Sequence, residues 1–377
     1  MLLFVFMQAC FTTGGAFLKV HIPERYLFHT TMVLGVAIVC LLLFILIYLL
    51  RFIRFTKKSS YLANHYSNLI SEITICESEE ELLHTVDQFC RQTNIRKWLT
   101  KPLGKTMLMK GLMNMRKGMA GAAADNIVWL YTYFEMDKYS LERLSSTHWH
   151  IKASAIQELA EMGQQQLITK IYRETNHKNI YVRTEAQVAV VKLTGFDGLR
   201  FLNLVGHTIT QWQQLCLLQQ LPAQDDFEWS KVPVWLQSQN DSVVEFALKL
   251  IEKYSRFDLH DVAAACLQHH SPVVKKQTLK TLKEINQEPT ASMLEQYFPN
   301  CTPEVQLTIL EVMVSIAAKE QLSFLTQVWR STHDDAIKHA ALKVIVHIYA
   351  AWPGMEENAS SLAALAANME NLKEELV

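Results

Sequence analysis

The chain has 377 residues, of which 50% are hydrophobic and 19% charged, and its mean hydropathy of +0.05 is high for a soluble protein. The formal net charge of −1 argues against a nucleic-acid-binding protein, which normally carries a strong basic excess. The seven cysteines are scattered and form no C-x-x-C pair, which argues against a disulfide framework or a zinc knuckle.

The first part of the chain, residues 1–30, is predicted to be an N-terminal apolar segment on the non-cytoplasmic side of a membrane. Residues 1–18 carry no charge, but polar residues and glycines interrupt them. They fit either a signal-like segment or a marginal first membrane span that would form a hairpin with the next one.

Residues 31–50 are an uninterrupted uncharged stretch, "TMVLGVAIVCLLLFILIYLL". Twenty residues of helix, at about 1.5 Å each, cross about 30 Å of hydrocarbon. The stretch therefore predicts a transmembrane helix. Four basic residues follow it (Arg51, Arg54, Lys57 and Lys58), and by the positive-inside rule the large C-terminal part is then cytoplasmic.

Residues 51–117 are predicted to be a basic juxtamembrane helical region, with short helices from residue 61. Ser78 and Glu81 have the spacing of a capping box that opens a helix. No acidic residue occurs between Asp87 and Asp125, whereas lysine, arginine and methionine are frequent there. Three interpretations remain open: a core helix that buries Leu108, Met109, Leu112 and Met113, a helix on an anionic lipid surface, or a groove for a partner helix.

From residue 118 to 350 a similar pattern returns every 30 to 32 residues. Its first apolar position is followed four and eight residues later by small or apolar residues, which places all three on one face of a helix. The predicted packing positions are Ile151, Ala155, Leu159, Val182, Ala186, Val190, Val243, Ala247, Ile251, Val274, Leu282, Val305, Ile337 and Ala341.

The starts of these helices carry an independent signal. Three residues before the first apolar position stand good N-cap residues, namely Asn179, Thr210, Asn240, Ser271, Thr302 and Asp334. Proline follows two of them, at the first helical position. A second apolar segment follows in each unit, so each unit is predicted to be a helical hairpin that buries its apolar face only by stacking on its neighbours.

The stretches "VRTEAQVAV" (182–190) and "IKASAIQEL" (151–159) resemble the short form of the HEAT-like α-solenoid repeat, V-R-x-x-A-x-x-x-L. The resemblance implies an all-α fold, a right-handed α-α superhelix of the HEAT/armadillo type. With its anchor, the chain also looks like bacterial inner-membrane HEAT-repeat proteins of unassigned activity. The basic second position is replaced by Gln214, Val244 and Gln306 in some units, which puts a shared ladder along the axis in doubt.

The sequence contains no recognisable catalytic or cofactor motif. Histidine pairs at 148/150 and 269/270 lack a partner at the i, i+4 spacing of a helical metal site, so solvated loop histidines are expected. No phosphate-binding or nucleophile-elbow glycine motif occurs. The sequence therefore predicts no enzyme, cofactor, metal or small-molecule substrate. Residues 351–377 are expected to form an amphipathic helix that caps the last repeat.

These patterns favour a scaffold or adaptor anchored in the inner membrane, whose cytoplasmic solenoid binds a membrane-associated protein such as an envelope or glycosyltransferase complex. Because the second helices line the concave face in the resembling solenoids, the candidate binding residues are Lys170, Arg173, Arg200, Trp235 and Trp329. Two alternatives stay open: a lyase or chaperone-type enzyme, since bilin lyases contain similar repeats, and a membrane-surface sensor that uses the basic, methionine-rich region.

Overall fold

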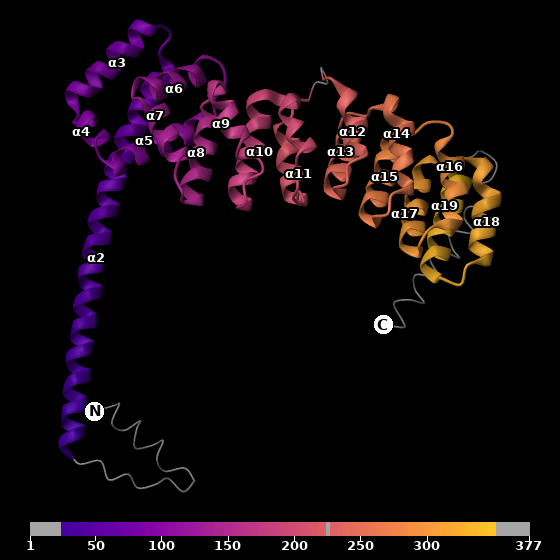
Figure 1. Cartoon of the computed structure of the whole chain (residues 1–377), viewed down its shortest axis with the longest axis horizontal. Helices are drawn as coiled ribbons and strands as arrows, with labels where there is room; N and C mark the ends of the chain where they lie inside the picture. The colour runs from indigo at the N-terminus through magenta and orange to yellow at the C-terminus, as the bar shows by residue number, and fades with distance from the viewer. Residues whose placement is uncertain (1–23, 224–226, 352–377) are drawn as a thin grey trace. The chain divides into compact units, whose positions relative to one another are not determined.

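The computed structural model describes residues 24–223 and 227–351 (Figure 1). The predictions for residues 1–23 and for the helix at 352–377 lie outside these residues. The described chain is helical and contains no strand, which confirms the predicted all-α class. It forms two compact units: the first comprises 24–115 and 119–127, and the second comprises 116–118 and 128–351.

The predicted membrane helix is part of a longer helix, α2 (Glu24–Ile75). Residues 28–58 are exposed along its whole circumference, and α2 is long and apolar enough to cross a membrane. The prediction of short helices from residue 61 is wrong for residues 61–75. There the sequence becomes amphipathic, and Leu62, Tyr66, Leu69 and Ile73, spaced three or four apart, are buried.

The first unit packs three further helices, α3 (Glu79–Gln92), α4 (Ile95–Leu99) and α5 (Pro102–Arg116), against the end of α2. Ser78 caps α3 as expected, because its side chain accepts a hydrogen bond from the Glu81 N–H. The Glu81 carboxylate accepts from the Glu77 N–H instead of that of Ser78. The capping-box prediction is therefore half correct.

The methionine-rich helix α5 contributes to the core of the first unit. Leu108, Met109 and Leu112 are buried, whereas Met113 is half-buried. At the start of α6 (Ala122–Tyr133), the Asn126 side-chain amide donates to two carbonyls at the end of α2. Of the three interpretations, the core role is confirmed for the three buried residues, which face neither lipid nor a partner groove.

The second unit repeats one arrangement after the end of α6 and α7 (Met136–Leu144). The first helices of the repeats are α8 (Trp149–Glu161), α10 (Ile180–Thr194), α11 (Gln211–Gln220), α13 (Asp241–Lys253), α15 (Pro272–Glu284), α17 (Pro303–Ile316) and α19 (Asp335–Ala351). Neighbouring first helices lie side by side along the unit (Figure 1). The handedness of the superhelix remains a prediction.

The second elements of the repeats are shorter. They are α9 (Ile168–Tyr172), a 3-10 segment (Gly195–Asn203), α12 (Val232–Leu236), α14 (His260–Ala265), α16 (Thr290–Tyr297) and α18 (Leu322–Ser331). The expected second helix after α10 is thus a 3-10 helix. Gly195, at φ +62°, ends α10, and a Cβ on Gly198 would lie 2.8 Å from the Val190 carbonyl oxygen. The close return of the chain requires glycine at both places.

The predicted packing positions lie in the interior with one exception. All are 4% exposed or less apart from Ile151, which is half-buried in the first turn of α8. Ala155, Ala186, Ala247 and Ala341 are fully buried, as expected where two helix backbones approach closely.

The predicted N-cap residues occupy their positions with two kinds of geometry. Side-chain oxygens of Asn179, Thr210, Asn240 and Asp334 accept hydrogen bonds from N–H groups of the following helical turn. Ser271 and Thr302 stand at the N-cap but make no such bond. In these two units, proline at the first helical position fixes φ for the helix start, so the signal there is proline rather than the cap side chain.

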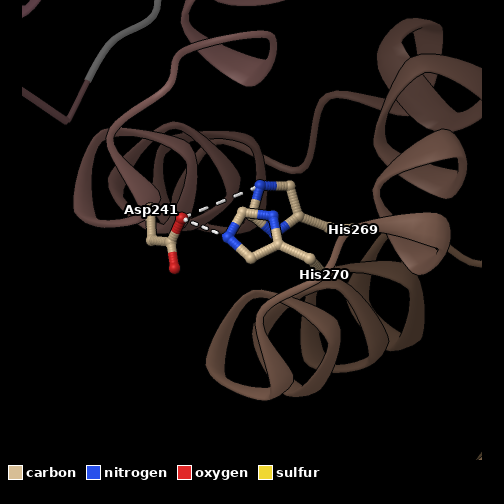
Figure 2. Close-up of side chains that lie close together, drawn as sticks. All are labelled: Asp241, His269 and His270. Atoms are coloured by element: carbon tan, nitrogen blue, oxygen red, sulfur yellow. Dashed lines mark ion pairs between the residues drawn. The ribbon is translucent and has the colours of Figure 1, made fainter.

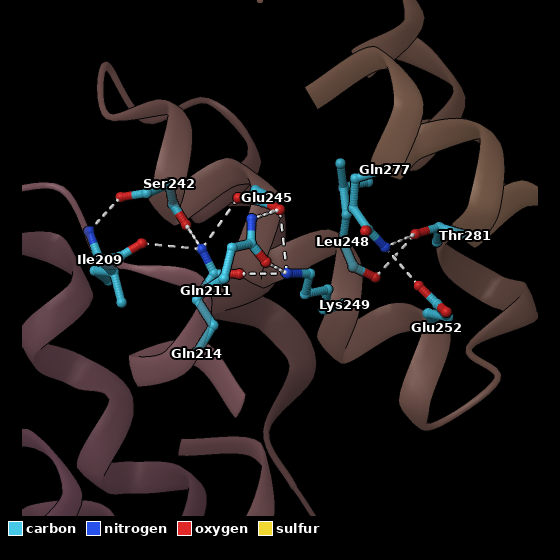
Figure 3. Close-up of polar contacts among 10 residues, drawn as sticks. All are labelled: Ile209, Gln211, Gln214, Ser242, Glu245, Leu248, Lys249, Glu252, Gln277 and Thr281. Carbon is cyan, nitrogen blue, oxygen red and sulfur yellow. Dashed lines mark hydrogen bonds and ion pairs between the residues drawn. The ribbon is translucent and has the colours of Figure 1, made fainter. Parts of the chain in front are cut away.

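A buried polar network joins α11 to α13 (Figure 3). The amide of Gln214 donates to Glu245 at 3.1 Å and to the Ile209 carbonyl at 3.2 Å, and Lys249 donates to its oxygen at 2.8 Å. Arg183 and Gln306, the equivalent residues of other units, likewise bond to carbonyls just before their own helices. In these three units the second repeat position therefore fixes the entry loop, whether it is basic or glutamine, whereas Val244 makes no such bond in its unit.

Replacing Gln214 by alanine should destabilise the second unit by about 2 kcal/mol, because Glu245 and Lys249 would lose a buried hydrogen-bonding partner. The free energy of unfolding from urea titration measures the effect. Gln211→Ala is the matched control: Gln211 also donates to Glu245, but it is exposed, so its loss should cost less than about 1 kcal/mol. Equal losses in the two variants would contradict the assigned role of Gln214.

Candidate protein-binding surface

The predicted binding residues do not all face outward. Lys170, Arg173 and Arg200 are exposed, and Arg200 pairs with Asp197 at 3.0 Å. Trp235 is 1% exposed, and its indole N–H donates to the Asn203 side chain at 2.7 Å. Its prediction as a binding residue is wrong, because the short helix α12 turns that side toward the core.

Trp329, on α18, is half-buried and packs against the core cluster of the second unit. Its indole nitrogen is buried and has no hydrogen-bonding partner among the described residues. This tryptophan therefore offers little surface to a partner. Neither predicted tryptophan has the exposure of a binding anchor.

Exposed aromatic residues occur instead at the starts of three successive first helices. Trp149 on α8, Tyr181 on α10 and Trp212 on α11 are 46%, 60% and 69% exposed. The rings of Trp149 and Tyr181 stack with their centroids 4.9 Å apart. We call these three residues the aromatic row. Large exposed aromatic side chains are enriched in protein-binding surfaces.

The repeat register contained a signal for this row. Tyr181 and Trp212 stand directly before the first position of the repeat pattern, where other units carry Ser242, Val273, Glu304 or Ala336. Trp149 stands two residues before that position of its own unit. The three aromatic residues lie outside the buried face of the first helices, so the apolar pattern does not mark them.

A groove of about 250 Å³ lies beside the row, between α8, α10 and α11. Trp212 forms part of its lining, together with Glu161, Glu185, Lys192 and Cys216. The groove is open on one side and belongs entirely to the second unit. It brings an indole ring and two carboxylates into one depression.

The two carboxylates differ in their electrostatic state. Glu161 forms an ion pair with Lys192. Glu185 is half-buried and has no described cation within ion-pair distance; burial raises the pKa of its carboxyl, and the more distant Lys117 partly opposes that rise. Burial, and secondarily Glu185, also raises the pKa of the Cys216 thiol, which favours the neutral form. The groove therefore suits a cationic side chain, which could pair with Glu185 and lie against Trp212.

Three potential metal-ligating groups meet elsewhere in the second unit (Figure 2). Ligand atoms of Asp241, His269 and His270 lie within 4.8 Å of one another, and Asp241 is 3.3 Å from His270. Chain spacing alone could not reveal this cluster, because Asp241 begins one first helix and the histidines precede the next. The expectation of solvated loop histidines is correct for His270, which is exposed, and wrong for His269, which is half-buried.

A structural role accounts for His269 without a metal. Its Nδ1 accepts a hydrogen bond from the Ser271 N–H at 3.1 Å, which requires an unprotonated Nδ1. Burial and the neighbouring His270 lower the pKa of His269, in agreement with a neutral ring. A cation would also meet the positive end of α13, which begins at Asp241.

The same hydrogen bond recurs at other repeat starts. Two residues before the N-cap, a side chain accepts from the N-cap N–H at 3.0–3.3 Å in five units, through Ser146, His177, Ser238, His269 and Thr332. Serine, threonine and histidine all supply a short-range acceptor. The recurrence identifies His269 as part of the repeat rather than as a special site.

No protein-family model and no curated protein sequence matches the chain. Among solved structures, a karyopherin complex, Kap95p with RanGDP, is 13% identical over 78% of this chain and 42% of that chain, with a TM-score of 0.35. Human deoxyhypusine hydroxylase with glycerol is 13% identical over 77% and 99%, with a TM-score of 0.29. The CpcE–CpcF complex of phycocyanin lyase from Nostoc is 13% identical over 69% and 89%, with a TM-score of 0.27. Similarities this distant assign no function to the chain.

Proposed function

We propose that the chain is a non-enzymatic scaffold, anchored in the bacterial inner membrane by α2, whose cytoplasmic second unit binds a basic segment of an integral membrane protein. The observation that carries the proposal is the aromatic row with its adjoining groove, where Trp212 is 69% exposed beside the half-buried Glu185. Large exposed aromatics next to a carboxylate without an ion pair favour a cationic protein ligand.

The membrane supplies ligands of this kind. Cytoplasmic segments that flank transmembrane helices are rich in lysine and arginine. A scaffold anchored in the same membrane meets such segments at a high effective concentration, since its search is confined to the membrane plane. Modest affinity per contact then suffices for a stable association.

The uniform exposure of residues 28–58 supports the anchor. A helix that is apolar on all sides must be covered by protein or lipid, and no described residue buries this part of α2. Arg51, Arg54, Lys57 and Lys58 follow the apolar stretch on the same helix and favour a cytoplasmic location of both units.

Photocrosslinking tests the binding surface. With p-benzoylphenylalanine in place of Trp212, in cells that naturally make the protein, we expect crosslinks to a lysine- and arginine-rich cytoplasmic segment of an integral membrane protein, identified by mass spectrometry. Glu185→Gln in the same background should lower the yield about tenfold, because it removes the one carboxylate of the groove without an ion pair.

The matched control places the same crosslinker at Leu204, which is 70% exposed on the second unit but away from the groove lining. Equal yield from both positions, or crosslinks from position 212 only to soluble acidic proteins, would refute the proposed surface. If Glu185→Gln left the crosslinking yield unchanged, the proposed pairing of a cationic segment with Glu185 would be refuted.

A further inference from the structure

A second pocket, of about 200 Å³, lies in the first unit, where α2, α4 and α5 meet. Three lysines line it: Lys58 from α2, Lys97 from α4, and Lys101 from the connection between α4 and α5. None of the three is within ion-pair distance of a described carboxylate, and Trp98 forms part of the wall. Three lysines around one pocket, without a described carboxylate to pair with, favour an anionic ligand.

The start of α5 adds to the positive potential of this pocket. Leu103 and Gly104, in the first turn of this 15-residue helix, line the pocket, and the first turn contains no acidic residue. Backbone N–H groups in a first helical turn have no partner within the helix and carry the positive end of the helix dipole. Helix starts of this kind bind phosphate groups in many proteins.

Gly104 makes the arrangement possible. A Cβ at this position would lie 2.1 Å from the Trp98 carbonyl oxygen, so only glycine allows the start of α5 to pack this closely on α4. The contact holds Lys97, Lys101 and the helix start together. The pocket is therefore a built feature of the fold, not a chance meeting of surface side chains.

A buried polar group lies close to Gly104 but outside the lining of the pocket. Tyr66 is fully buried, and its hydroxyl has no hydrogen-bonding partner among the described residues. The hydroxyl lies 3.3 Å from the position that a Cβ of Gly104 would take. Burial raises the pKa of Tyr66, so the group stays a neutral donor. Its ring packs edge-on against Trp98, so Tyr66 supports the wall of the pocket.

The pocket lies close to the apolar part of α2. Phe55 is the last large exposed apolar residue of that part, and Lys58 follows three residues later, about 4.5 Å along the helix axis. If α2 spans the membrane, as proposed above, Lys58 lies at the depth of the lipid phosphates.

We propose that this pocket binds a phosphate group, and that its source is the headgroup of an anionic phospholipid. Lys58, Lys97 and Lys101 would neutralise the phosphate, and the N–H groups at the start of α5 would donate to its oxygens. The choice of lipid over free phosphate rests on the membrane location proposed for α2. The binding of a phosphate group by these lysines does not depend on that location.

Native mass spectrometry of the full chain in detergent, titrated with phosphatidylglycerol, tests the site. We expect one saturably bound lipid per chain, and an affinity about 30-fold lower in Lys97→Gln/Lys101→Gln, from the loss of two basic contacts near a lipid phosphate. Arg91→Gln/Lys110→Gln removes the same charge from exposed positions of the first unit outside the pocket lining and should change the affinity less than twofold.

Two further arms separate the possible outcomes. Competition by millimolar inorganic phosphate at equal affinity would identify free phosphate as the ligand and refute the lipid source. Equal loss of affinity in the two double variants, or lipid binding that does not saturate, would refute the pocket. Alkaline extraction of native membranes tests the anchor separately: release of the chain would overturn the membrane location, while a phosphate site seen by titration would still stand.

Discussion

Replacing Ala247 by glutamate should unfold the part of the second unit around α13. Ala247 is fully buried in the core cluster, with no described cation placed to neutralise a carboxylate there. Burying an unpaired charge costs more than about 4 kcal/mol, which in a unit of about 200 residues corresponds to a fall in Tm of roughly 10 °C. Differential scanning calorimetry of the full chain in detergent would measure the change.

Ala265→Glu is the matched control for this prediction. Ala265 lies on α14, the second helix of the same repeat, and is exposed, so the same substitution should change Tm by less than about 2 °C. Equal behaviour of the two variants would show that the repeat register is misplaced. Thermal unfolding that becomes less cooperative because only the region around α13 melts early would still agree with this register, since each repeat mainly contacts its neighbours.

The double substitution Leu41→Lys and Leu42→Lys should release the protein from the membrane. Both leucines lie near the middle of the exposed apolar part of α2. Each lysine at the centre of a membrane helix costs about 3 kcal/mol and replaces a favourable leucine, so insertion should become less favourable by roughly 6 kcal/mol or more. Alkaline carbonate extraction of cell membranes, followed by immunoblotting, would show the protein in the soluble fraction.

Ile75→Lys with Leu83→Lys adds the same charge at exposed apolar positions of the first unit, outside the apolar stretch. We expect this variant to remain in the membrane fraction. Retention of the Leu41→Lys/Leu42→Lys protein after carbonate extraction would contradict a single anchoring helix in α2. Release of the unchanged protein would contradict the anchor altogether.

The first helices were predictable because two signals agree in six of the seven repeats, all except that of α8. Apolar residues at steps of four mark the buried face, and a cap or a proline marks the start, so Val182 and Asn179 locate α10 independently. The second elements were less predictable. They contain few residues, and Gly195 and Gly198 convert one into a 3-10 segment, which the apolar pattern of Leu199 and Leu202 does not distinguish from an α-helix.

The candidate sites were harder to predict for a different reason. The direction in which Trp235 faces depends on how a five-residue helix packs, and no periodicity specifies that. The lysine pocket joins α2 to residues about 40 positions later, through a contact that depends on Gly104. Two members of the aromatic row, Tyr181 and Trp212, could by contrast have been found by comparing the same position in successive repeats, whereas Trp149 is offset by one residue.

The continuity of α2 has a mechanical consequence. One helix of 52 residues, about 78 Å long, carries both the exposed apolar part and the buried residues from Leu62 to Ile73. The side chains packed against its second half turn with it. If its first half lies in lipid, a change in bilayer thickness that tilts α2 would also displace the lysine pocket near its other half. Rotation of α2 about its own axis would likewise move the helices that pack against Leu62 to Ile73. The protein would then convert strain in the membrane into movement of its first unit.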